Sequence, residues 1–208
     1  MGTLLLATNN RGKRVEMLSI LRAAPSLADR INLVTPAELH LELSVDETGN
    51  TYAENAALKA LAFCQASGLI ALADDSGLEV AALGGSPGLH SARYSPLPGA
   101  TDADRRTYLL AQLAGKPRPW KAHFHCTVAI AAPGGGLYYR QGRVDGEIIP
   151  EERGTQGFGY DPLFYLPELQ KTMAELNMAD KNRLSHRARA LQAALPILEM
   201  LFSMPPAP

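Results

Sequence analysis

The sequence predicts an α/β fold built on a mixed β-sheet. Short apolar segments alternate with helix-like segments along the first half of the chain, which is typical of parallel βαβ units. A hairpin of two strands follows in the second half, and its antiparallel pairing makes the sheet mixed. The 208 residues, 46% hydrophobic and 20% charged, suffice for a sizeable core and exclude a disordered or collagen-like chain.

Three short apolar runs predict the first strands. Residues 4–7 read as a buried strand of a parallel sheet, and the polar loop at residues 8–13 follows it. Apolar residues then recur at helical spacing over residues 15–21, which predicts a helix. Residues 31–34 and 69–73 predict the second and third strands.

Capping signals mark two further helices. Thr51 and Glu54 form a capping box, in which each side chain satisfies a free backbone amide at the helix start. An alanine- and leucine-rich run continues to Ala66, and Gly68 is a stop signal. Residues 101–113 predict another helix that begins with a polar cap.

The second half of the chain predicts mainly strands and one last helix. Residues 123–131 and 136–142 form the hairpin, and residues 163–165 form a short strand. Ser185 opens a helix over residues 185–201, and the proline-rich tail at residues 205–208 is expected to be frayed.

Charge and cysteine content exclude several classes of protein. Lys and Arg total 20 against 21 Asp and Glu, whereas a general nucleic-acid coat carries a basic excess. A basic cleft beside an acidic one would give the same total. Cys64 and Cys126 are too few and too far apart for a zinc site or a disulfide scaffold. With neither a signal peptide nor a membrane span in the sequence, we expect a soluble cytoplasmic protein.

The loop at residues 8–13 is a candidate phosphate site. A polar loop before a helix offers free amides and the positive end of the helix dipole. Gly12 allows close backbone approach, and Lys13 adds a positive charge. The segment lacks the Walker pattern, so it is not a P-loop. An ordinary strand-to-helix turn with a solvated lysine is the alternative.

Four carboxylates form a candidate metal site. Asp74 and Asp75 follow the third strand and are expected at its C-terminal end, and Asp46 and Glu47 lie in an earlier acidic loop. Adjacent strand residues point to opposite faces, so Asp74 and Asp75 are not expected to face the same way. Carboxylates from a strand and a distant loop suit Mg²⁺, which takes oxygen ligands. Simple turn chemistry is the alternative for the Asp-Asp-Ser-Gly segment.

The helix that begins after Thr51 carries Asn55 and Lys59 four residues apart, hence on one face. Lys59 sits among alanines and leucines, where a long side chain extends toward a polar target. A solvated lysine is the alternative, and for Glu54 a purely capping role is favoured.

The last cluster combines an aromatic residue between glycines with basic side chains. Phe158 between Gly157 and Gly159 can lie flat against a base, and such stacking contributes roughly 1–3 kcal/mol. The start of the last helix adds the donors of Ser185 to Arg187. A core phenylalanine and a solvated basic helix end are the alternatives.

These motifs together resemble one family. In order along the chain they are ATNNRGK at residues 7–13 with Glu16, ETG at 47–49, TYAENAALK at 51–59, ADDSGL at 73–78, GGSPGLHSARY at 84–94, GFGYDP at 157–162, and Lys181 with SHR at 185–187. The set is similar to the inosine/xanthosine triphosphate pyrophosphatase family. Small departures are Asn9-Asn10, where many members have Gly-Asn, and Tyr52, where phenylalanine is common.

The resemblance implies hydrolysis of dITP or ITP and dXTP or XTP to the monophosphate and pyrophosphate. It also implies Mg²⁺, a homodimer, no nucleic-acid or membrane partner, and an elongated mixed sheet with flanking helices. Residues 1–208 would form one domain with two lobes around a central cleft.

The resemblance also assigns roles to residues. Asp75 is implied as the catalytic base and a metal ligand, and the second ligand is expected in the pair Asp46 and Glu47 without a choice between them. The implied substrate contacts are Thr8, Asn9, Asn10, Arg11, Gly12, Lys13 and Lys59 for the phosphates, then Ser76, Phe158, Gly159, Tyr160, Asp161, Lys181, His186 and Arg187.

Base choice would follow from hydrogen bonding. The 6-oxo group of hypoxanthine or xanthine would accept from His186 and Arg187, whereas the 6-amino group of adenine would leave these donors unpaired. The same argument does not reject guanine. Two other classes stay open: a nucleotide-binding regulatory module without catalysis, and an RNA-binding protein that uses the aromatic and basic cluster.

Overall fold

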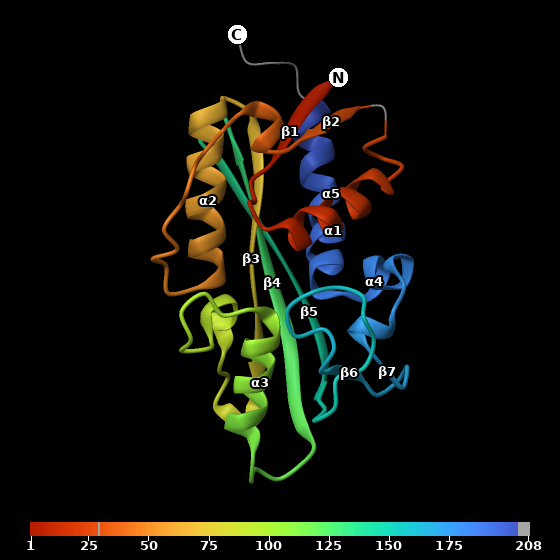
Figure 1. Ribbon diagram of the computed structural model, residues 1–208. Coiled ribbons are helices and arrows are strands. Elements are labelled where there is room, and N and C mark those ends of the chain that lie inside the picture. Colours follow the sequence, from red (N-terminus) through yellow and green to blue (C-terminus); the bar gives the residue numbers. More distant parts are fainter. Residues whose placement is uncertain (29, 204–208) are drawn as a thin grey trace. The chain divides into compact units, whose positions relative to one another are not determined.

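The computed structural model describes residues 1–28 and 30–203 (Figure 1). Its strands are β1 (Gly2–Leu6), β2 (Ile31–Val34), β3 (Ile70–Val80), β4 (Trp120–Ala132), β5 (Gly136–Ile148), β6 (Phe164–Leu166) and β7 (Lys171–Thr172). Its α-helices are α1 (Arg11–Arg22), α2 (Tyr52–Ser67), α3 (Asp102–Leu113), α4 (Met178–Leu184) and α5 (His186–Ser203). The tail at residues 205–208 lies outside the described residues.

The strands form a mixed sheet. Within the described residues it has seven strands in the order β2-β1-β3-β4-β5-β6-β7. β1 pairs in parallel with β2 and β3, whereas β6 pairs antiparallel with both β5 and β7. The predicted α/β fold with a mixed sheet and flanking helices is therefore confirmed.

The chain divides into two compact units. Unit 1 comprises residues 1–75, 126–142 and 187–208, and unit 2 comprises residues 76–125 and 143–186. β3, β4 and β5 contribute residues to both units. Within the described residues, unit 1 has two hydrophobic clusters and unit 2 has one.

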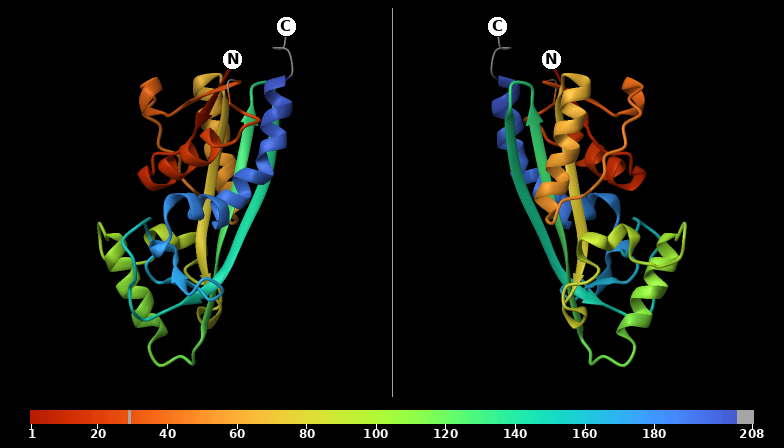
Figure 2. Two further views of the ribbon diagram at one scale, coloured as in Figure 1. Left: turned by 90° about the vertical axis from the view of Figure 1, so that its right-hand side faces the viewer. Right: turned by 90° about the vertical axis from the view of Figure 1, so that its left-hand side faces the viewer.

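Unit 1 buries both faces of its part of the sheet. Leu4 and Leu6 of β1 pack with α1 and α5, whereas Leu5 packs with α2 in a separate core. Figures 1 and 2 show α2 on one side of these strands and α1 and α5 on the other. Because successive strand residues alternate between faces, a strand buried on both sides must be apolar throughout, as residues 4–7 are.

The core of unit 2 contains residues of β3, β4, β5, β6 and α3. The Phe124 ring lies 4.5 Å from the Phe164 ring and stacks on the imidazole of His186 at 4.7 Å. α3 contributes Leu109 and Leu113, both fully buried. The aromatic side chains of β4 and β6 thus belong to the same core as α3.

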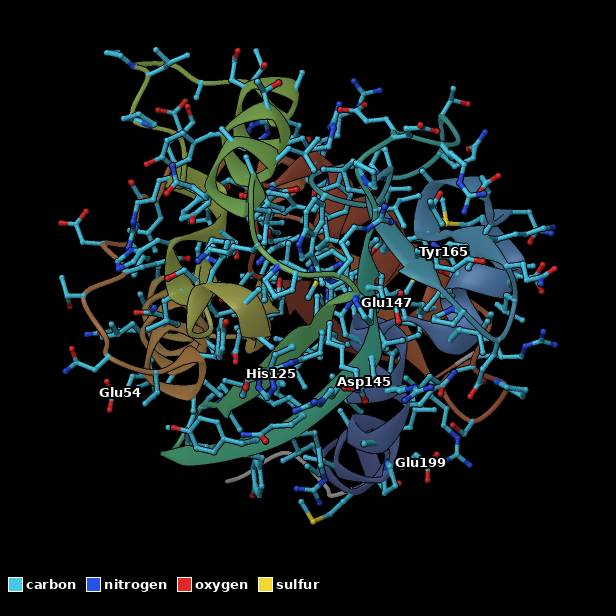
Figure 3. All side chains as sticks on the ribbon, turned by 90° about the horizontal axis from the view of Figure 1, so that it is seen from below. Glu54, His125, Asp145, Glu147, Tyr165 and Glu199 are labelled. Atoms are coloured by element: carbon cyan, nitrogen blue, oxygen red, sulfur yellow. The ribbon has the colours of Figure 1, made fainter. Side chains whose placement is uncertain are left out.

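The predicted caps are present, with one change of partner. Thr51 Oγ1 accepts from the amide of Glu54 at 3.1 Å, and Gly68 ends α2 with φ of 69°. The Glu54 carboxylate accepts from the amide of Asn50. Glu54 itself is exposed, and its side chain points outward at the edge of Figure 3.

Two features differ from the sequence prediction. β3 continues to Val80, so Asp74 and Asp75 lie inside the strand and not at its C-terminal end. Their carboxylates find charged partners from other elements, which lets the strand continue through a segment with turn composition. α4 was not predicted; Asn177 caps it by accepting from the amide of Asp180 at 2.8 Å.

No helix in the described part of the chain is long and apolar enough to cross a lipid bilayer.

Gly146 tests the close pairing of β5 and β6 in unit 2. A Cβ at this position would lie 2.5 Å from the backbone carbonyl oxygen of Tyr165 on β6. Tyr165 pairs with Glu147, the residue after Gly146, and both are labelled in Figure 3. We expect Gly146→Ala to lower the free energy of unfolding in urea by about 1–3 kcal/mol, because a backbone carbonyl must move.

The control is Gly136→Ala in the same strand, where the nearest atoms to the new Cβ are side-chain atoms, the end of Tyr138 at 3.0 Å and Cβ of Ala132 at 3.5 Å. Equal losses in both variants would contradict the prediction.

Candidate active site

A buried charged cluster joins three elements of unit 1. The Arg187 guanidinium at the start of α5 donates from Nε and Nη2 to Asp74 Oδ2, each at 3.1 Å, and from Nη1 to Glu16 of α1. These three residues are at most 3% exposed. Cys126 Sγ also donates to Asp74 Oδ2, at 3.8 Å. Asp74 therefore gathers donors from α5 and from β4.

Lys13 brings the predicted phosphate loop to the same carboxylate. Its Nζ lies 3.2 Å from Asp74 Oδ2, and its side chain keeps 15% exposure. Burial alone would raise the pKa of Asp74, but the positive charges of Lys13, Arg187 and Lys59 hold that pKa well below its usual range. Asp74 is therefore ionised at neutral pH and holds the Lys13 ammonium in place.

The loop before α1 has a defined conformation. Thr8 Oγ1 accepts from the amide of Asn10 at 3.2 Å, and Asn10 Oδ1 accepts from the amide of Lys13 at 3.0 Å. Asn10 is therefore the N-cap of α1, which begins at Arg11. Asn9 Nδ2 donates to the carbonyl of Leu43 at 3.0 Å. The loop thus places the positive end of a helix dipole beside Lys13, as an anion site requires.

A second group of polar side chains surrounds Asp75. Lys59 Nζ on α2 lies 2.5 Å from Glu47 Oε1 and 3.9 Å from Asp75 Oδ1, and Asn55 Nδ2 donates to Asp75 Oδ2 at 3.2 Å. Asp74 and Asp75 thus contact different elements, as the alternation of strand residues predicts. Burial, reinforced by the charge of Glu47, raises the pKa of Asp75 despite Lys59, Lys13 and Asn55.

The structure distinguishes the two acidic loop residues. Glu47 is half-buried and bonds Lys59, whereas Asp46 is exposed. Glu47 therefore joins the group around Asp75. Among residues 1–28 and 30–203, no cluster of three or more Asp, Glu, His or Cys side chains is assembled for a metal ion.

In unit 2, Asp161 organises the glycine-rich loop. Its Oδ2 accepts from the amide of Phe158 at 2.8 Å and from Lys181 Nζ at 2.5 Å. Lys181 Nζ also lies 5.3 Å from the centre of the Phe158 ring, a cation–π distance. A Cβ at Gly157, where φ is 79°, would lie 2.1 Å from Asp161 Oδ2. Only glycine fits there.

The remaining predicted residues of unit 2 have internal contacts. Gly159 donates its amide to Asp102 Oδ2 at 2.7 Å, and the buried Tyr160 donates its hydroxyl to the carbonyl of Ser91 at 2.8 Å. Burial raises the pKa of Tyr160, so it stays a neutral donor. His186 is 6% exposed against Phe124, and Ser76 is half-buried on β3.

The predicted site residues thus fall into two groups. Unit 1 holds Thr8, Asn9, Asn10, Arg11, Gly12, Lys13, Asp46, Glu47, Lys59, Asp75 and Arg187, and unit 2 holds Ser76, Phe158, Gly159, Tyr160, Asp161, Lys181 and His186. The sequence patterns assigned no role to Glu16. Its position nevertheless falls on the helix face that carries the apolar residues Met17, Ile20 and Leu21. A carboxylate within such an apolar stripe signals a buried partner. For Asp102, the sequence indicated only a place in the cap of a helix and gave no sign of its bond to Gly159.

Arg187 tests the buried cluster. We expect Arg187→Met to lower the free energy of unfolding by about 3–5 kcal/mol, because it removes the one buried guanidinium that pairs with both Asp74 and Glu16. Urea unfolding measures this loss. Arg183→Met is the control, since Arg183 pairs with Asp180 at 3.1 Å but its side chain is 72% exposed. A loss below about 1 kcal/mol is expected there, and a loss that small for Arg187→Met would contradict the analysis.

Comparison with known proteins identifies the family. A "dITP/XTP pyrophosphatase" from Desulforamulus reducens is 45% identical over 200 residues, which is 96% of each chain. Another, from Thermus thermophilus, is 47% identical over 194 residues, 92% of this chain and 89% of that protein.

Solved structures agree. A HAM1 protein from Coxiella burnetii superposes with a TM-score of 0.83 at 39% identity, over 96% of this chain and all of that one. The Ham1 protein of Staphylococcus aureus gives 0.82 at 37% identity, over 96% and 99% of the two chains. The sequence profile of the Ham1 family matches residues 4–197. The resemblance inferred from the motifs is confirmed, and the chain belongs to the Ham1 family.

Proposed function

We propose that this chain hydrolyses non-standard purine nucleoside triphosphates, dITP or ITP and dXTP or XTP, to the monophosphate and pyrophosphate. The observation that carries the proposal is the group around Lys59 in unit 1, where one ammonium lies beside the carboxylates of Glu47 and Asp75. Such a group can bind phosphate oxygens, a cation and a water molecule at once. The relatives named dITP/XTP pyrophosphatases support the substrate class.

Glu47 and Asp75 would hold Mg²⁺. Both offer oxygen atoms, and both contact the same cation, Lys59. Mg²⁺ is usually bound through one or two protein carboxylates together with waters and substrate phosphates, so two carboxylates fit it without a third. When bound, the ion supplies positive charge that offsets repulsion between the nucleophile and the triphosphate. We therefore choose Glu47 over Asp46 as the second ligand.

Asp75 would act as the general base. Its carboxylate accepts a proton from a water molecule as the water oxygen forms a bond to the α-phosphorus. The bond between the α-phosphorus and the bridging oxygen breaks, and pyrophosphate leaves with that oxygen. Lys59 and Asn55, which contact the two oxygens of Asp75, hold this carboxylate in a defined position.

The cations of unit 1 would bind the phosphates. Lys13 and Lys59 keep 15% and 14% side-chain exposure, and each is held by a carboxylate in a defined position. The loop from Thr8 to Gly12 adds the positive end of the α1 dipole, and the side chains of Thr8 and Asn10 already hold its conformation. These groups stabilise the charge that develops on the leaving pyrophosphate.

The nucleoside contacts are proposed from the family resemblance for Ser76, Phe158, Gly159, Tyr160, Asp161, Lys181, His186 and Arg187. The Phe158 ring, which Asp161 and Lys181 hold in place, suits stacking on a purine. Arg187 already donates to Asp74 and Glu16, so we propose that its main role is to hold those two carboxylates in place. A base contact from Arg187 stays a prediction.

We also propose, from the family resemblance, a cytoplasmic homodimer without nucleic-acid or membrane partners. One two-lobed domain over residues 1–208 remains a proposal as well. Light scattering on the purified protein tests the dimer.

A nucleotide panel tests the activity. With Mg²⁺, we expect dITP, ITP and XTP to yield pyrophosphate. ATP should be at least about 100-fold slower in kcat/KM, because its 6-amino group leaves donors of the site unpaired. Slower turnover of GTP is expected from the family resemblance alone. Coupled detection separates pyrophosphate from orthophosphate, and release of orthophosphate would contradict the proposal. Tight binding by calorimetry without turnover would favour a regulatory module. Binding of a labelled oligonucleotide at physiological salt would favour the RNA-binding alternative.

Asp75→Asn tests the base. The amide keeps the size of the side chain but cannot accept the proton at neutral pH, so we expect kcat for ITP to fall by about 10²–10⁴-fold with little change in the melting temperature. The control is Asp145→Asn, an exposed carboxylate on β5 labelled in Figure 3, which should leave kcat unchanged. Wild-type turnover by Asp75→Asn would remove Asp75 from this role.

A further inference from the structure

Asn55 of α2 is a fully buried polar residue. It lies in the first turn of α2 and is 1% exposed, next to the buried Ala56 and Ala57. Burying an amide side chain costs free energy unless its donors and acceptor are bonded. Packing alone would be served by an apolar residue, so the reason for asparagine lies in its bonds.

Both ends of the Asn55 carboxamide are bonded, and the partners come from different segments. Oδ1 accepts from the amide of Gly49 at 2.8 Å, and Nδ2 donates to Asp75 Oδ2 at 3.2 Å. The carboxamide is planar, with a donor on one side and an acceptor on the other. One rigid group therefore links the backbone of the loop at residues 46–50 to a carboxylate on β3.

Gly49 shows how closely the loop approaches α2. A Cβ on Gly49 would lie 2.7 Å from Asn55 Oδ1 and 2.6 Å from Glu54 Cβ. The contact therefore requires a glycine at this position. Because Gly49 is held against α2, the backbone at Glu47, two residues earlier, is restrained as well.

The same helix face then orients Glu47 and Asp75. Lys59 lies four residues after Asn55, hence one turn along α2 on the same side. Its Nζ contacts Glu47 Oε1 at 2.5 Å and Asp75 Oδ1 at 3.9 Å. Asn55 holds one oxygen of Asp75, and the other oxygen is the one near Lys59.

We propose that Asn55 is a positioning residue that sets the distance between Asp75 and Glu47 by bonding Asp75 directly and Glu47 through the backbone of Gly49. This inference rests on the proposed function, which makes Asp75 the base and both carboxylates the holders of Mg²⁺. Asn55 itself touches neither substrate nor metal in this assignment. Its loss should affect turnover and metal affinity more than nucleotide affinity.

Two substitutions separate the two bonds. Asn55→Ala removes both, whereas Asn55→Asp keeps an acceptor for the Gly49 amide and replaces the donor to Asp75 with a carboxylate. The matched control is Glu54→Ala. It removes the bond to the Asn50 amide in the same loop and the same helical turn, and Glu54 is exposed.

For Asn55→Ala we expect kcat for ITP to fall about 10–100-fold, with KM changed less than about threefold, because misplaced catalytic groups affect turnover first. Mg²⁺ binding to the free enzyme, measured by calorimetry, should weaken about tenfold or more. Amide hydrogen exchange at residues 47–50 should accelerate. Asn55→Asp should lose kcat comparably while exchange at the loop stays near the wild-type rate. Glu54→Ala should keep wild-type kcat and Mg²⁺ affinity.

The outcomes that would overturn the inference are distinct. Unchanged kcat and Mg²⁺ affinity in Asn55→Ala, even with faster loop exchange, would show a purely structural residue. Equal losses of kcat in Glu54→Ala would show that general loosening of the loop is responsible. If Asn55→Ala does not fold, Asn55→Asp with wild-type kcat overturns the inference equally. Wild-type protein that hydrolyses none of the nucleotides refutes the proposed function instead, and the exchange and Mg²⁺ measurements still test the two bonds.

Discussion

The buried guanidinium of Arg187 is the interaction on which unit 1 depends. It bonds Asp74 of β3 and Glu16 of α1 from the start of α5, and all three side chains are shielded from water. A buried charge costs several kcal/mol unless a partner compensates it, so none of these elements can move away alone. The same Asp74 oxygen holds Lys13. The position of the phosphate loop is thereby tied to the core of the unit.

Two neighbouring carboxylates on one strand acquire different chemistry from their surroundings. Asp74 meets Lys13 and Arg187, and these cations keep it ionised although it is completely buried. Asp75 meets one nearby lysine, a second carboxylate and an amide, and its pKa is raised. Environment, not residue type, separates the anchoring carboxylate from the proposed base. β3 can carry both because adjacent residues of a strand face opposite ways.

Much of the fold was predictable because its signals are local. The apolar run at residues 4–7, the cap at Thr51 and the stop at Gly68 act within a few residues, and the structure has each of them. The end of β3 was not predictable. Its Asp-Asp-Ser-Gly segment has turn composition, and only charged partners from α1, α2 and α5 allow it to continue as a strand. α4 lacked a clear apolar period and was missed.

For the site, the sequence by itself determined which residue types are available and in what order, and the ordered motifs were enough to identify the family. Only the tertiary structure decided how they are used. It placed Glu47 and not Asp46 beside Lys59, and turned the Arg187 donors toward Asp74 and Glu16. It also gave Asn55 partners from two distant segments. Ion pairs and hydrogen bonds between residues up to 171 positions apart depend on distances that no local pattern encodes.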